Sequence, residues 1–210
     1  HKKKGGTPTM GGVVFIVAAV IASYICHYQN FMNPYVNLLT FSLLGFGIIG
    51  FIDDYLIVVQ HSNKGLKPSY KYAMQSVVAI AFYFLAKKFL PNFSTEIIIP
   101  IAHISVNLGW FYPIFVYFMF TAESNAVNLT DGLDGLATGL MIIALTPFVV
   151  FAILSKNVEA AIFGAALMGG LTGFLVFNAH PAKIFMGDCG SLALGGILAA
   201  FAVITKQELL

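Results

Sequence analysis

Long apolar segments separated by short polar turns dominate the chain. No Asp, Glu, Lys or Arg occurs in residues 5–52, which are long enough for two membrane crossings joined by the polar turn at 27–34. A helix that crosses the ~30 Å hydrocarbon core needs ~20 largely apolar residues. Five further apolar runs follow, so the pattern predicts about seven spans. These runs cover residues 72–86, 110–122, 135–155, 160–177 and 192–205.

The spans should be helices rather than barrel strands. Backbone polar groups find no water in the hydrocarbon core, so a spanning segment is a helix or part of a closed barrel. The alternating pattern of barrel strands is absent. We therefore expect an all-α fold, a polytopic integral-membrane helical bundle in which residues 1–210 form a single domain. Short β-branched stretches in residues 91–109 predict a small hairpin in an outer loop.

Composition supports a membrane protein. The chain is 59% hydrophobic and 10% charged, with a mean hydropathy of +0.86. A soluble domain usually carries about 25% charged residues. The net charge of +2 is too small to indicate a nucleic acid partner, and all 11 basic residues are Lys. Cys26 and Cys189 are far apart in the sequence, which favours two free thiols over a disulfide or a metal-binding pair.

The distribution of lysines predicts the orientation. With seven alternating spans, seven lysines fall on one side and four on the other. Cytoplasmic loops carry the excess of Lys and Arg, so we expect the N-terminus in the cytoplasm. The cytoplasmic group is Lys2, Lys3, Lys4, Lys64, Lys67, Lys71 and Lys183, and the outer group is Lys87, Lys88, Lys156 and Lys206.

All five aspartates fall on the predicted cytoplasmic side, although they play no part in setting the orientation. A carboxylate within a spanning helix costs ~2.5–3.5 kcal/mol on insertion scales. Acids do not follow the positive-inside rule, so a one-sided cluster needs another cause. Five carboxylates at helix ends on one face predict a site for a hard cation, which in turn binds phosphates. The aspartates are Asp53, Asp54, Asp131, Asp134 and Asp188.

The first aspartate segment, GFIDDY at 50–55, ends the second predicted span. Adjacent residues on a helix point ~100° apart, so one of Asp53 and Asp54 can face a site while the other holds a neighbouring element. A solvated helix end is the alternative. Acids at a helix C-terminus oppose the macrodipole, however, which favours a functional role.

The second segment, NAVNLTDGLDGLA at 125–137, places Asp131 and Asp134 three residues apart, on one face of a predicted helix. The alternative is a capping box with Asp131 as the N-cap. Two Asn, two Asp and two Gly within eleven residues favour a Gly-rich helix start that binds a phosphate or a base.

The third segment, NAHPAKIFMGDCGSL at 178–192, brackets Asp188 with Gly187 and Gly190 before a predicted helix. A helix N-terminus favours an anion, and Asp188 would supply an oxygen ligand for the accompanying metal. The structural alternatives are an N-cap for Ser191, a loop position for His180 and packing for Phe185.

These segments, together with HKKKGGTPTMGG at 1–12 and PAKIFMGDCGSLALGG at 181–196, resemble the polyprenyl-phosphate N-acetylhexosamine-1-phosphate transferases. Order and spacing also fit over essentially the whole chain. GTPTMGG is similar to the branch that transfers phospho-N-acetylmuramoyl-pentapeptide. Cys189 stands where this family usually has Thr. The family's first helix, its final helices and its His-rich cytoplasmic loop have no counterpart here, so we expect part of a larger bundle.

The resemblance implies a reaction. UDP-N-acetylmuramoyl-pentapeptide and undecaprenyl phosphate would give lipid I and UMP with Mg²⁺, at the cytoplasmic face of the bacterial inner membrane, for peptidoglycan biosynthesis. Alternatives are a sister transferase that uses UDP-GlcNAc, a cation transporter and a purely structural membrane subunit. A transporter should hold its acids near the membrane midplane. The oligomeric state stays open between a monomer and a homodimer.

The resemblance also implies site residues. Asp188 would be the metal-binding acid, Asp53 the base or positioning group for the lipid phosphate, and Asp54 its support. The lipid phosphate would attack directly or after a covalent aspartyl intermediate, and stereochemistry at phosphorus distinguishes the two. Lys64, Lys67 and Lys71 are candidates for holding either phosphate, or are only topology signals. The implied substrate-binding positions are Lys4, Thr9, Asn128, Asp131, Gly132, Leu133, Asp134, Asn178 and Phe185.

Overall fold

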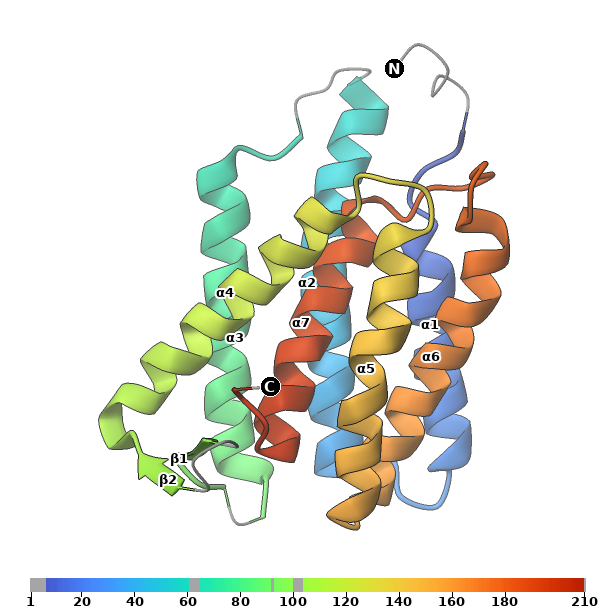
Figure 1. Cartoon of the computed structure of the whole chain (residues 1–210). Helices are drawn as coiled ribbons and strands as arrows, with labels where there is room; N and C mark the ends of the chain where they lie inside the picture. Colours follow the sequence, from blue (N-terminus) through green and yellow to red (C-terminus); the bar gives the residue numbers. More distant parts are fainter. Residues whose placement is uncertain (1–6, 61–64, 92, 100–103, 210) are drawn as a thin grey trace.

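In the part of the chain that the structure describes, seven α-helices form a bundle in which successive helices run in opposite directions (Figure 1). The computed structural model describes residues 7–60, 65–91, 93–99 and 104–209. Each of the seven predicted spans corresponds to one α-helix, so the all-α bundle is confirmed. The helices are α1 Gly12–Cys26, α2 Pro34–Gln60, α3 Pro68–Phe89, α4 Tyr112–Thr130, α5 Leu136–Leu154, α6 Val158–Asn178 and α7 Gly187–Thr205.

Within the described ranges, four helices are long and apolar enough to cross a membrane, namely α2, α5, α6 and α7. The helix α1 is apolar but has only 15 residues. The helices α3 and α4 are less apolar because α3 carries Lys71, Lys87 and Lys88, and the second half of α4 contains Glu123 and two asparagines. Seven predicted helices are therefore present, and four meet the requirements of a span by length and composition.

The predicted hairpin is also present. Strands β1 (Glu96–Ile99) and β2 (Ile104–Asn107) pair antiparallel, with Ile97 opposite Val106. The 3₁₀ helix η1 (Gly109–Phe111) then leads into α4. In Figure 1 the hairpin lies at the end of the bundle opposite the start of α1. Most of its side chains are exposed, so it adds little to the core.

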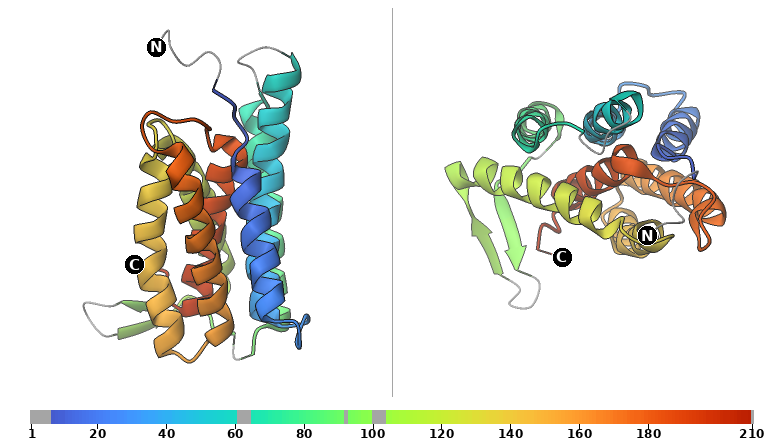
Figure 2. Two further views of the ribbon diagram at one scale, coloured as in Figure 1. Left: turned by 90° about the vertical axis from the view of Figure 1, so that its right-hand side faces the viewer. Right: turned by 90° about the horizontal axis from the view of Figure 1, so that it is seen from above.

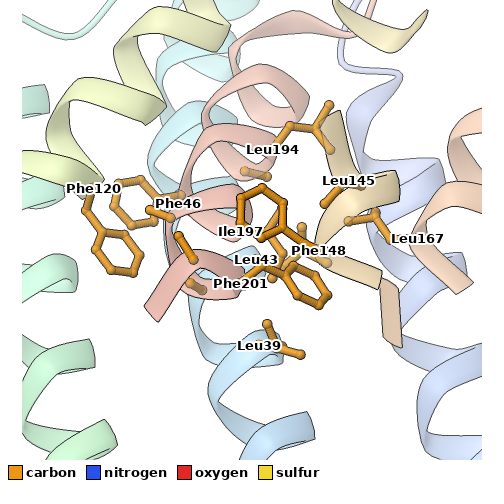
Figure 3. Packing of buried hydrophobic residues seen from close by; sticks show 14 of the residues in the cluster. Leu39, Leu43, Phe46, Phe120, Leu145, Phe148, Leu167, Leu194, Ile197 and Phe201 are labelled. Carbon is orange, nitrogen blue, oxygen red and sulfur yellow. The ribbon is translucent and has the colours of Figure 1, made fainter. Parts of the chain in front are cut away.

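Helix α7 is the centre of the bundle, and most of its residues are buried (Figure 2). Gly and Ala are frequent in α7, and small residues let neighbouring helix backbones approach closely. Figure 3 shows Leu194, Ile197 and Phe201 of α7 between aromatic side chains of α2 and α4 on one side and side chains of α5 and α6 on the other. The labelled neighbours are Leu39, Leu43, Phe46, Phe120, Leu145, Phe148 and Leu167.

The C-terminal part of α2, the turn from α4 to α5, and the start of α7 lie at the same end of the bundle (Figure 1). We call this the aspartate end, because these segments contain all five aspartates. The predicted one-sided distribution of acids is therefore confirmed. Of the described lysines, Lys67, Lys71 and Lys183 belong to segments at the aspartate end, and Lys87, Lys88, Lys156 and Lys206 to segments at the opposite end.

Candidate active site

Asp54 of α2 caps the first turn of α7. Its carboxylate accepts hydrogen bonds from the backbone N–H of Asp188 at 3.1 Å and of Cys189 at 2.9 Å. The N-cap residue of α7 itself, Met186, makes no side-chain capping bond. A carboxylate suits this position, because the first N–H groups of a helix lack partners and carry positive partial charge. Buried Asp54 therefore fixes the start of α7 against α2.

Two glycines make this contact sterically possible. Gly50 precedes Asp54 by one turn, and a Cβ atom at Gly50 would lie 2.0 Å from the carbonyl oxygen of Asp188. Gly187 has a φ of +74°, and a Cβ atom there would lie 2.4 Å from Oδ2 of Asp54. Glycine is the residue that adopts this left-handed conformation without steric cost. The sequence around Gly50 thus allows α2 to approach the backbone of α7.

Asp53 points to a different partner. Its Oδ1 accepts a hydrogen bond from the backbone N–H of Leu66, just before α3, and its Oδ2 lies 3.3 Å from Nζ of Lys71. The two neighbouring aspartates therefore divide their contacts between α7 and the start of α3. This agrees with the expectation that one faces a shared site while the other holds a neighbouring element.

Both oxygens of Asp188 have donors from other helices. Nζ of Lys71 in α3 forms an ion pair with Oδ2 of Asp188. The side-chain amide of Asn128 in α4 donates to Oδ1 of Asp188 at 2.9 Å and to Oγ of Ser191 at 2.8 Å. Because Lys71 also contacts Asp53, four helices meet at this point. We call Asp53, Lys71, Asn128 and Asp188 the carboxylate cluster.

Asn178, the last residue of α6, stabilises the loop between α6 and α7. This side chain is buried, donates to the carbonyl oxygen of Ile184 at 3.0 Å and accepts from Oγ1 of Thr138 at 2.7 Å. Asn178 was expected in the substrate site. In this structure its amide donates to the backbone of the loop, so it helps to set the shape of the loop.

Asp134 braces the same loop from the turn after α4. Its Oδ2 lies 3.1 Å from Nδ1 of His180 and accepts from the backbone N–H of Ala182 at 3.2 Å. His180 is largely exposed, as expected of a loop residue. The structure thus joins Asp134 to the loop before α7.

The N-terminal segment runs beside the start of α7. The backbone N–H of Phe185 donates to the carbonyl oxygen of Pro8 at 2.8 Å, and that of Gly11 donates to the carbonyl oxygen of Phe185 at 2.9 Å. Phe185 is half-buried. Exposed Thr9 lies beside Gly187, since a Cβ atom at Gly187 would be 3.1 Å from Oγ1 of Thr9. Lys4 lies outside the described residues.

The second aspartate segment differs from its prediction. Helix α4 continues to Thr130, Asp131 is its C-cap residue, and residues 131–135 form a turn before α5. Asp131 and Asp134 therefore do not share a helix face, and the capping-box interpretation is wrong. Gly135, with a φ of +74°, separates the two helices. Gly132 and Leu133 are exposed in this turn.

The predicted boundaries of α2 and α7 are also corrected. Helix α7 begins at Gly187, so Asp188 lies in its first turn instead of in a preceding loop. Ser191 is not an N-cap, because its Oγ donates to the carbonyl oxygen of Gly187 within α7 at 3.1 Å. Helix α2 continues past Asp53 and Asp54 to Gln60. The cap from Asp54 explains the early start of α7, since it satisfies N–H groups that would otherwise lack partners.

The bridging position of Lys71 was missed by the sequence analysis, which weighed this residue only for phosphate or topology. The spacing of polar residues in α3 could have indicated that Lys71 faces the bundle. Lys71 and Gln75 are four residues apart in α3, so they share a helix face. Gln75 is fully buried and accepts a hydrogen bond from Asn125 at 2.9 Å. A polar stripe on α3 thus faces the asparagines of α4.

The donor chemistry of the carboxylate cluster fits Mg²⁺. Among the described residues, no three His, Cys, Asp or Glu side chains converge as a ready cage. Asp53 and Asp188, however, direct carboxylate oxygens at one shared cation, the ammonium of Lys71. Mg²⁺ is usually bound by one or two carboxylates together with substrate phosphates and water. Two carboxylates of this kind match that requirement.

Comparison with known proteins gives consistent matches. The family profile described as Glycosyl transferase family 4 matches residues 35–206, and the profile described as Phospho-N-acetylmuramoyl-pentapeptide-transferase signature 1 matches residues 4–16. Proteins named phospho-N-acetylmuramoyl-pentapeptide-transferase are 49% identical in Bacillus subtilis (strain 168) and Bacillus anthracis, and 47% identical in Halalkalibacterium halodurans. Each comparison covers 100% of this chain and 64% of the relative, so the chain spans less than two thirds of their length.

Proposed function

The chain belongs to glycosyl transferase family 4, and from this membership we propose that it transfers a phospho-sugar from a soluble nucleotide to a lipid phosphate at the membrane surface. The donor would be UDP-N-acetylmuramoyl-pentapeptide and the acceptor undecaprenyl phosphate, with lipid I and UMP as products. The donor is argued from the signature at residues 4–16 and the 49% identity to proteins named for this transfer.

The carboxylate cluster is the observation that carries this proposal. It lies at one end of an apolar bundle, where a soluble substrate and a lipid head group can meet. A cation transporter would instead place its acids near the middle of the spans. Asp188 and its partner Lys71 lie in the first turns of α7 and α3, which favours a reaction at the membrane boundary.

The reaction exchanges one P–O bond for another. An oxygen of the lipid phosphate attacks the phosphorus that carries the sugar, and the bond from that phosphorus to UMP breaks. Asp188 and Asp53 would hold Mg²⁺, which when bound neutralises charge on the diphosphate and the leaving UMP. The protein's own part is positioning. Asp54 fixes the turn that carries Asp188, and Asn128 orients one oxygen of its carboxylate.

The nucleotide would bind between the N-terminal segment and the loop before α7. Phe185 would stack on uracil, and exposed Thr9, Gly132 and Leu133 are accessible to a soluble substrate. Asp134 supports this loop through the backbone of residue 182. Lys4 and Asp131 are also among the residues proposed to bind the nucleotide-sugar. The aspartate end would face the cytoplasm from the bacterial inner membrane, because the predicted spans assign seven of the eleven lysines of the sequence to this side.

The test is release of UMP by protein reconstituted with undecaprenyl phosphate and Mg²⁺. UDP-N-acetylmuramoyl-pentapeptide is expected to give UMP and a lipid-linked product, and UDP-GlcNAc is expected to give neither. Omitting the lipid phosphate should stop the release. Turnover of UDP-GlcNAc alone would identify the sister reaction. Cation flux across vesicles without UMP release would contradict the transferase assignment.

A further inference from the structure

The ammonium of Lys71 lies between two carboxylates from different helices. It is 3.3 Å from Oδ2 of Asp53 and also pairs with Oδ2 of Asp188. The side chains are 17% exposed for Lys71, 9% for Asp53 and 28% for Asp188. The contact is thus mostly shielded from solvent, yet Lys71 and Asp188 keep an opening to it.

The two carboxylates favour a cation between them. Two like charges that share a partly buried site repel each other, and only an opposite charge or protonation relieves this. Asn128 and the backbone N–H of Leu66 contribute neutral donors, and Asp54 adds a further carboxylate on the next residue of α2. Lys71 is the ammonium that contacts Asp53 and Asp188 together, so it holds α2, α3 and α7 at this point.

We propose that Lys71 is a built-in counter-ion, which occupies the cation position between Asp53 and Asp188 in the free site and leaves it when a divalent metal ion binds. The released ammonium then binds a phosphate oxygen of the substrate. The last step rests on the proposed function, whereas the exchange of cations does not. Lys71 would therefore compete with the metal before the reaction and assist the phosphates during it.

The side chain and its position suit this exchange. Lys71 is the fourth residue of α3, close to the aspartate end, and its ammonium is carried on a flexible four-carbon stem. Moving the ammonium needs no rearrangement of a helix. Asn128 and Asp54 keep Asp188 in place while the cation changes, because their hydrogen bonds do not involve Lys71.

The test measures metal affinity without any substrate. Mn²⁺, whose free ion is counted by electron paramagnetic resonance, titrates the wild type, Lys71→Met and Lys87→Met. Lys71→Met is expected to bind Mn²⁺ about tenfold more tightly, because the metal no longer displaces a charge-assisted contact. It is also expected to lose UMP release, since a phosphate contact is gone. Lys87→Met makes the same change near the other end of α3 and should match the wild type in both measurements.

An unchanged or weaker Mn²⁺ affinity in folded Lys71→Met overturns the proposal. If this variant does not fold, the accessibility of Lys71 is measured in the wild type instead. Lysines are acetylated at trace level, and the extent of labelling at each one is read by mass spectrometry. Labelling of Lys71 relative to Lys87 should increase when Mn²⁺ is added, and no increase overturns the proposal. Failure of the wild type to release UMP would instead refute the proposed function, and the Mn²⁺ result would stand independently.

Discussion

The carboxylates around the first turn of α7 are bound by different kinds of donor, which separates their tasks at the scale of single residues. Asp54 accepts two backbone N–H groups of α7, so its charge is used in joining two helices. Asp53 and Asp188 share the ammonium of Lys71, so both carboxylates are directed at one cation position. Neighbouring residues of α2 thus have a structural role and a candidate catalytic role.

Asp54→Asn is expected to lower stability. The amide offers one oxygen to two N–H donors and turns its own NH₂ group toward one of them. Leaving a buried donor without a partner costs about 1–3 kcal/mol. Thermal unfolding in detergent should therefore shift down by several degrees, whereas Glu159→Gln at the opposite end of the bundle should shift it less. An unchanged midpoint for Asp54→Asn would refute its role as the cap of α7.

Asp188→Asn is expected to abolish UMP release while the protein still inserts and folds. Asn preserves the shape of the side chain and its contact with Asn128, but removes the charge that a hard divalent cation prefers. Activity and thermal unfolding should be measured on the same preparation. Near-normal turnover with unchanged Mg²⁺ dependence would exclude a metal-binding role for Asp188.

Phe185→Ala is expected to weaken binding of the UDP-sugar by about 1–3 kcal/mol, the range typical of base–aromatic stacking. The loop should keep its path, since its contacts with Pro8 and Gly11 use only backbone atoms. Calorimetric titration with the UDP-sugar measures the effect. Equal affinity in the wild type and the variant would leave packing as the role of Phe185.

At the scale of elements, the site depends on how closely α2 approaches α7. Gly50→Ala would place a Cβ atom 2.0 Å from the carbonyl oxygen of Asp188, so the helices must separate. Overpacking of this kind costs about 1–3 kcal/mol, and the shift should also reduce activity. Gly173→Ala in α6 is the matched control, because its Cβ atom would meet nothing within 4 Å. Equal stability and activity for both variants would show that this approach is unimportant.

The sequence predicts which segments form helices better than it predicts the residues at which each helix begins and ends. Apolar runs identify where helices lie, because burial in lipid or in the bundle needs apolar side chains along most of a helix. The early start of α7 depends on a cap supplied by Asp54, 134 positions earlier in the chain, and local signals carry no trace of it. The turn at 131–135 shows the same limit, since its two glycines and two aspartates fit a helix start as well as a loop.

The carboxylate cluster shows what pattern analysis captures of the site. The gathering of aspartates at one end follows from counting spans, so it was predictable. The bridge from Lys71 to Asp53 and Asp188 was not predictable. It depends on which face each of three helices turns toward the others in the packed bundle. The stripe formed by Lys71 and Gln75 indicates which face of α3 is buried, but not which carboxylates it meets.

At the scale of the whole molecule, the orientation in the membrane is a prediction from the lysines of the sequence, and it decides which compartment would supply the soluble substrate. The native cysteines provide a direct test. Cys26 is exposed at the end of α1 opposite the aspartates, and Cys189 is buried in α7. A membrane-impermeant maleimide should therefore label Cys26 in sealed right-side-out vesicles and leave Cys189 unmodified.

The variant Leu129→Cys, combined with Cys26→Ser, tests the accessibility of the aspartate end in the same vesicles. Leu129 is 83% exposed near the end of α4 that lies at the aspartate end. Its cysteine should react only after the vesicles are opened, because the aspartate end is expected in the cytoplasm. Labelling of the Leu129 position in sealed vesicles, together with protection of Cys26, would reverse the orientation. The carboxylate cluster would then face away from a cytoplasmic nucleotide-sugar, which would contradict the proposed donor.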